Sequence, residues 1–89
     1  MKNEISKKLL DLKFDPSYKG FYFLVEMLYV KNQNKISNLN VLYDIIAKEN
    51  NTSIAAIGRN ISTCIRKSNN EYKGKTVGEV VNTLSVILC

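Results

Sequence analysis

Hydrophobic residues recur along this chain at the spacing of helix faces, and polar breaks divide them into about five segments. In the first segment the apolar residues lie about one helical turn apart: Ile5, Leu9 and Leu12. This spacing predicts a short helix that ends by Phe14, since Pro16 disfavours a helical Asp15 and suits the first turn of a new helix. No segment alternates between apolar and polar residues as a strand does, so the pattern predicts an all-α fold.

The second segment, Lys19 to Val30, is densely apolar and aromatic. Its apolar residues fall on two helix faces: Phe21, Leu24, Val25 and Leu28 on one, and Phe23, Met27 and Val30 on the other. A helix that is apolar on two sides is usually packed between neighbours. We therefore expect a central helix whose aromatic side chains belong to the core. The polar stretch Lys31 to Asn38 that follows is predicted to be a loop that caps the next helix.

Two further helices are predicted to lie on either side of a short turn. Leu39 to Glu49 has the apolar spacing of one helix face, and Asn50 to Ser53 contains residues that tolerate a left-handed backbone or cap a new helix. From Ile54 the apolar positions are Ile57, Ile61, Cys64 and Ile65, and the opposite side carries Ala55, Ala56, Arg59, Ser62, Thr63 and Arg66. This is the build of a DNA-binding helix-turn-helix, spanning roughly Leu39 to Asn69.

The C-terminal part of the sequence predicts one more helix. A polar break from Lys67 to Lys75 contains Gly74, and a helical stripe follows it: Val77, Val80, Val81, Leu84, Ile87 and Leu88. We expect this stripe to pack against the bundle, or in part against a second copy of the chain. With 89 residues and 45% hydrophobic content, the chain can bury one small core but not two. Residues 1–89 are thus predicted to form a single all-α domain of about five helices that contains a helix-turn-helix.

The charge and the cysteine content limit which partners and which metal sites the chain can have. Thirteen Lys and Arg against eight Asp and Glu give a net charge of +5, which suits a polyanionic partner. The lysines are scattered, however, so charge alone indicates an ordinary solvated surface. Two cysteines and no histidine exclude a common structural zinc site, and we expect no metal and no cofactor. Cys64 is predicted to lie in the core and Cys89 at a mobile chain end, without a disulfide between them.

The sequence gives no support to an enzyme or a membrane protein. It has no histidine and no glycine-rich phosphate loop, and its scattered carboxylates form no spaced pair with a base or nucleophile. The first residues lack the apolar core of a secretory signal, and no apolar run approaches the roughly 18 residues of a membrane span. We therefore expect a cytoplasmic, non-catalytic protein with no membrane partner.

Two ordered blocks of sequence carry a resemblance to a known family. They are Tyr18-Lys-Gly-Phe-Tyr-Phe-Leu with Glu26-Met-Leu, and Leu42-Tyr43 with Ile46-Ala-Lys and Asn51-Thr-Ser. Through these blocks the chain resembles the C-terminal DNA-binding effector domain of the stage-zero sporulation response regulator of endospore-forming bacteria. The resemblance runs from about Ile5 to Asn70 and more weakly over Lys75 to Leu88. It implies an all-helical bundle that binds promoter DNA, and hence a role in transcription regulation and sporulation.

The chain departs from this family in the second helix of the pair. The family has Arg-Val-Glu-Arg where this chain has Ala56-Ile57-Gly58-Arg59, so only Arg59 keeps a base-facing residue type. Ser62 and Thr63 stand where the family has an arginine and a histidine. Because of these departures, the family's operator sequence is not expected to carry over to this chain. We also expect a stand-alone domain without a receiver domain, in which phosphorylation control of the family type does not operate.

Two functions of different class follow. In the first, the chain regulates transcription by binding double-stranded DNA, and the DNA-binding residues are predicted to be Arg59, Asn60, Ser62, Thr63, Arg66 and Lys67. The alternative interpretation of Arg59 and Arg66 is that they belong to an ordinary solvated helix face. In the second, the chain is a protein-interaction module that has lost most DNA reading. It would form a homodimer or modulate a related regulator through a smooth, low-charge patch of Ala55, Ala56 and Gly58.

Overall fold

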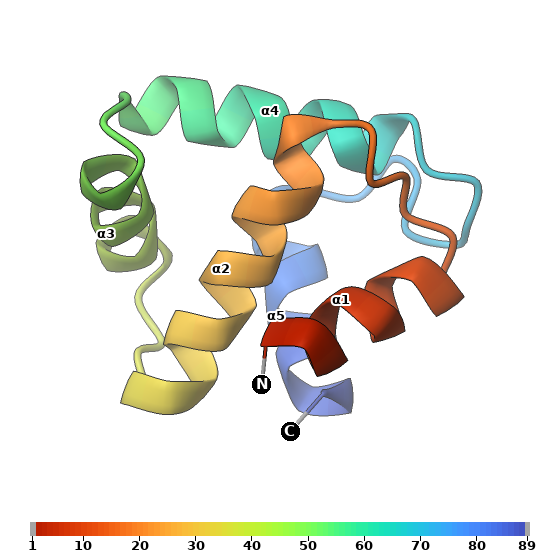
Figure 1. Cartoon of the computed structure of the whole chain (residues 1–89), viewed down its shortest axis with the longest axis horizontal. Helices are drawn as coiled ribbons and strands as arrows, with labels where there is room; N and C mark the ends of the chain where they lie inside the picture. Colours follow the sequence, from red (N-terminus) through yellow and green to blue (C-terminus); the bar gives the residue numbers. More distant parts are fainter. Residues whose placement is uncertain (1, 89) are drawn as a thin grey trace.

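Five helices make up residues 2–88, the part of the chain that the computed structural model describes. They are α1 (Lys2–Asp11), α2 (Lys19–Asn34), α3 (Leu39–Glu49), α4 (Ile54–Arg66) and α5 (Val77–Ile87). Residues 2–88 contain no strand. Figure 1 shows α4 lying across one end of the bundle, with α3 at one side and α1 and α5 below it. The predicted all-α bundle of about five helices is therefore confirmed.

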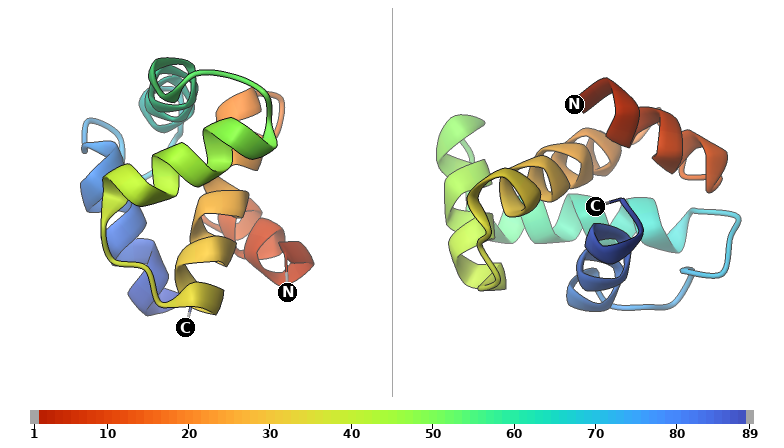
Figure 2. Two further views of the ribbon diagram at one scale, coloured as in Figure 1. Left: turned by 90° about the vertical axis from the view of Figure 1, so that its left-hand side faces the viewer. Right: turned by 90° about the horizontal axis from the view of Figure 1, so that it is seen from below.

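Helix α2 is the central element, as its two apolar faces predicted. It packs against each of the other four helices, most extensively against α4. Its side chains Leu24, Met27 and Leu28 are fully buried, and Phe21 is nearly so. Burying side chains of this size contributes about 1.5–3 kcal/mol each, so α2 supplies much of the hydrophobic stabilisation. Figure 2 shows the other helices arranged around it.

Helix α2 is longer than the sequence analysis predicted. The polar residues from Lys31 to Asn34 continue the helix instead of opening the loop. Polar side chains do not break a helix when they can point to solvent, and the chain leaves α2 only at Lys35, whose backbone is left-handed with φ 55°. The Lys31 ammonium donates to the Ile36 carbonyl at 3.3 Å. That contact ties the short connection to the last turn of α2.

Helices α3 and α4 have the bounds that the sequence predicted, and their caps explain why. The Asn38 side chain accepts from the Asn40 N–H at 2.9 Å, and the Ser53 hydroxyl accepts from the Ala56 N–H at 3.1 Å. Between the helices, Asn51 adopts a left-handed backbone with φ 53°. Asparagine tolerates this conformation better than most residues. The two helices cross steeply, and α4 is seen nearly end-on where α3 runs across the view (Figure 2, left).

The polar break between α4 and α5 is tied to the end of α1. The Asn70 amide donates to the Leu12 carbonyl at 2.6 Å, while its oxygen accepts from the Ser68 hydroxyl and the Tyr72 N–H, both at 2.9 Å. The rings of Tyr72 and Phe14 stack with centroids 5.8 Å apart. The loop therefore contributes buried contacts to the core.

Helix α5 buries most of its predicted stripe. Val77, Val80, Val81 and Leu84 are buried. Ile87 was predicted to join them but is 54% exposed, because the last turn of α5 leaves only Leu88 packed in part against the core. Cys64 is fully buried as predicted, whereas Cys89 lies outside the described residues. Each helix within residues 2–88 is too short or too polar to cross a bilayer.

Candidate nucleic-acid interface

Helix α4 has one buried face and one exposed face. The buried face consists of Ile57, Ile61, Cys64 and Ile65. The opposite side, here called the outer face of α4, consists of the exposed residues Ala55, Arg59, Ser62 and Arg66 with the partly buried Thr63. The buried residues fix α4 against α2 and α3. The outer face is therefore presented on a rigid helix.

The outer face of α4 is cationic and unneutralised. Helix α4 contains no Asp or Glu. Within residues 2–88 the one ion pair joins Lys48 to Asp44 on α3, at 3.0 Å, so Arg59 and Arg66 have no ion-pair partner there. Lys67, the C-cap of α4, is exposed as well. These three side chains are free to meet an anion.

The predicted site residues do not all lie on one surface. Arg59 and Arg66 are seven residues apart, so they lie two helical turns or about 10 Å from each other on the same side. Ser62 is exposed between them, and Thr63 is partly covered beside them. Asn60 instead lies on the flank of α4: its side-chain amide donates to the Ala56 carbonyl at 2.8 Å within the same helix, and its backbone carbonyl abuts Gly20 of α2. The structure thus places four of the six residues, Arg59, Ser62, Thr63 and Arg66, on the outer face of α4. The exposed Lys67 lies just beyond the end of the helix, and Asn60 lies on its flank.

Gly58 is partly buried below the ring of Tyr43, on α3. A Cβ at Gly58 would stand 3.6 Å from the Tyr43 hydroxyl oxygen, an ordinary contact distance. Burial of the Tyr43 ring raises the pKa of its hydroxyl above the usual 10.0, so the group stays neutral at physiological pH. This neighbour covers part of the low-charge patch predicted from the sequence, while Ala55 stays exposed.

A pocket of about 310 Å³ lies beside α4 and was not foreseen from the sequence. It is called the flank pocket here, and its lining residues are Lys19, Tyr22, Phe23, Asn50, Thr52 and Asn60. They come from the start of α2, the turn before α4 and α4 itself. Nothing in the local pattern links Lys19 to Thr52, 33 residues later. Gly20, a small residue in a densely apolar helix, is the one sequence signal of the close helix crossing that brings them together.

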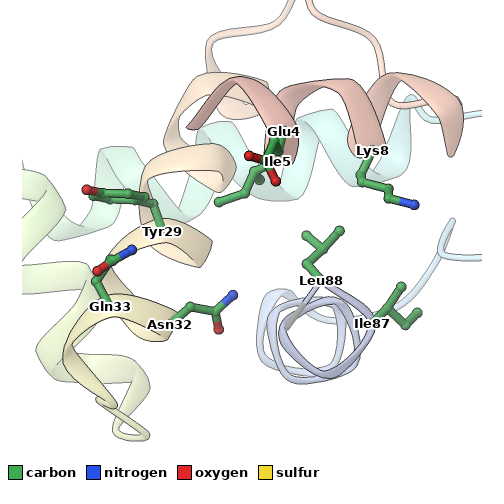
Figure 3. A pocket seen from close by; sticks show the side chains of 8 residues that line it. All are labelled: Glu4, Ile5, Lys8, Tyr29, Asn32, Gln33, Ile87 and Leu88. Carbon is green, nitrogen blue, oxygen red and sulfur yellow. The ribbon is translucent and has the colours of Figure 1, made fainter. Parts of the chain in front are cut away.

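A second pocket, of about 240 Å³, lies away from α4, between α1, the end of α2 and α5. Figure 3 shows its eight lining residues: Glu4, Ile5, Lys8, Tyr29, Asn32, Gln33, Ile87 and Leu88. It combines one carboxylate, one ammonium group and two aliphatic side chains from α5 and its C-cap. None of its lining residues belongs to α3 or α4, so this pocket is separate from the outer face.

Two kinds of reactive side chain can be placed within the described residues: possible metal ligands and the Cys64 thiol. In residues 2–88, no group of three His, Cys, Asp or Glu side chains is placed to hold a metal ion. Burial raises the pKa of the Cys64 thiol to about 11, with Asp15 adding to the shift. A thiol with that pKa is neutral at physiological pH and is a poor nucleophile.

A comparison of the chain with protein-family models, curated proteins and solved structures gave no match. Function is therefore inferred from the geometry of the outer face of α4 and from the sequence blocks quoted above.

Proposed function

We propose that this chain is a DNA-binding transcription regulator in which α3 and α4 act as a helix-turn-helix and α4 enters the major groove. One observation carries the proposal. The outer face of α4 presents two arginines without ion-pair partners in residues 2–88 and contains no carboxylate. A helix of about 10–12 Å diameter fits a major groove about 12 Å wide.

Each of the predicted DNA-binding residues has a specific role in this proposal. Arg59, near the middle of α4, contacts a base edge, where a bidentate contact to guanine gives about 1–3 kcal/mol of discrimination. The hydroxyls of Ser62 and Thr63 make polar contacts beside it. Arg66 and Lys67, at the end of α4, contact phosphates and fix the register of the helix in the groove. One N–H of the Asn60 amide is held by the Ala56 carbonyl, so Asn60 has fewer groups to offer the DNA than the outer face has.

The resemblance to the sporulation effector domain supports the same function. Its second block covers α3 and the turn, from Leu42 to Ser53. By this resemblance we propose a role in sporulation, while the changes at Ala56 and Ser62 mean that the family's operator sequence does not carry over.

A second candidate function is a protein-interaction module. Ile54 is 47% exposed at the start of α4, next to the exposed Ala55. Two apolar residues in solvent suit a protein surface better than a phosphate backbone. The partner in this case is a second copy of the chain or a related regulator.

A selection from random duplex DNA, followed by fluorescence anisotropy at two salt concentrations, tests the first function. We expect affinity to fall steeply with added salt. Arg59→Ala should lower discrimination between selected and random sequences about tenfold, and Arg66→Ala should weaken binding to both equally. Lys7→Ala, on α1, removes one charge far from α4 and is the matched control. Salt-independent binding, no binding, or unchanged affinity in both arginine variants would contradict the proposal and leave the protein-interaction module.

A further inference from the structure

The flank pocket contains three hydrogen-bond donors that the fold does not use. Lys19, at the start of α2, is exposed and has no ion-pair partner within residues 2–88. Tyr22 is 54% exposed, and Thr52 is exposed in the turn before α4. The hydroxyls of Tyr22 and Thr52 make no hydrogen bond to other described residues. One ammonium group and two hydroxyls therefore face solvent around one hollow.

The other polar residues of the flank pocket, Asn50 and Asn60, already donate hydrogen bonds from their side-chain amides. The Asn50 amide donates to the Glu26 carboxylate at 2.9 Å and to the Ile46 carbonyl at 2.8 Å. The Asn60 amide donates to the Ala56 carbonyl. No carboxylate lines the pocket, and the neighbouring Glu26 carboxylate is bound by Asn50. Because Lys19 is the one charged residue that lines the pocket, and the two hydroxyls can donate beside it, an anionic oxygen ligand fits the pocket.

We propose that the flank pocket binds a backbone phosphate of the DNA strand that borders the groove occupied by α4. This inference rests on the proposed function. Lysine, tyrosine and threonine are among the side chains that contact phosphate oxygens in protein–DNA complexes. The ligand class is a phosphodiester of duplex DNA, and Lys19 supplies the charge while Tyr22 and Thr52 supply hydroxyl donors.

The position of α2 places this pocket where a strand would pass. Helix α2 begins beside the middle of α4, as Figure 1 shows. A Cβ on Gly20 would stand 2.1 Å from the Asn60 carbonyl oxygen, so the two backbones touch and cannot shift apart or slide without loss of packing. A helix that fills the major groove has a sugar–phosphate strand on each side of it. The strand on the α2 side would meet Lys19 and Tyr22.

The test measures the salt dependence of DNA binding by the full chain and a Lys19→Gln variant, with Lys7→Gln as control. Both variants lose one charge from an exposed side chain, but Lys7 lies on α1. We expect Lys19→Gln to weaken binding about tenfold. It should also reduce the slope of log affinity against log salt by about 0.9, the value of one phosphate contact. Tyr22→Phe should weaken binding less and leave the slope unchanged.

The outcomes separate this inference from the proposed function. If the wild-type chain shows no salt-dependent DNA binding, both proposals fall. If the wild-type chain binds and Arg66→Ala weakens it, but Lys19→Gln behaves like Lys7→Gln, the proposed function stands and the phosphate site is refuted. A urea titration of each variant checks folding, and equal midpoints are expected because Lys19 and Tyr22 are exposed.

Discussion

Gly20→Ala should destabilise the protein more than its small size suggests. The added Cβ would lie 2.1 Å from the Asn60 carbonyl oxygen, 2.6 Å from the carbonyl carbon and 2.9 Å from the Cys64 Cβ. Two of these atoms are backbone and the third is fully buried, so no flexible side chain can yield. Ordinary carbon contacts need about 3.5 Å, so α2 and α4 must separate by roughly 1 Å along their most extensive contact.

The size of the effect follows from overpacking. Forcing extra atoms into a packed core costs about 1–3 kcal/mol, and alanine returns less than about 1 kcal/mol through its better helix propensity. We expect a net loss of about 1–2 kcal/mol, measured by urea unfolding followed by far-UV circular dichroism. Gly58→Ala is the matched control: its Cβ would stand 3.6 Å from Tyr43, so the propensity gain of up to about 1 kcal/mol should appear as stabilisation. Equal midpoints for wild type and Gly20→Ala would refute the close crossing of α2 and α4.

Three further predictions concern caps, loops and the buried thiol. The N–H and hydroxyl of Thr76 lower the pKa of Glu79 below 4.5, so this contact stabilises the fold above pH 4.5 and is lost as pH falls through the lower folded pKa. Glu79→Gln should therefore lose less stability on acidification than wild type, as followed by urea midpoints. Asn70→Ala should cost about 1–3 kcal/mol because it leaves buried partners unpaired, whereas the exposed Asn69→Ala should be neutral in thermal melts. In a variant with Cys64 as the single cysteine, a thiol reagent should react slowly until urea is added, and fast reaction in buffer would contradict its burial.

The helices that the sequence predicted correctly are those with strong local signals. Around α3 and α4, apolar periodicity and the caps Asn38 and Ser53 agree, so both helices have the predicted bounds. The polar composition from Lys31 onward predicts a loop, but α2 continues to Asn34. Helix α2 ends at the left-handed backbone of Lys35, and a lysine at this position does not predict that conformation.

The candidate site was predictable only in part, for a related reason. Helical spacing alone puts Arg59, Ser62 and Arg66 on the side opposite the isoleucines. Helical spacing does not indicate which neighbouring helix covers each side of α4. The sequence therefore could not predict that the Asn60 backbone meets α2 or that Gly58 lies against Tyr43 of α3. The flank pocket brings together Lys19 and Thr52, which are 33 residues apart in the sequence, and no periodic pattern predicts that they line one pocket.

The contact between Gly20 and the Asn60 carbonyl has a consequence for how the protein would recognise DNA. Because α2 and α4 are locked at that point, the distance between a phosphate held at Lys19 and a base met by Arg59 is set by the protein. A duplex whose groove is too wide or too narrow must deform to satisfy both, and the cost of deformation depends on its sequence. Base pairs that no side chain touches would then influence affinity through the stiffness of the DNA.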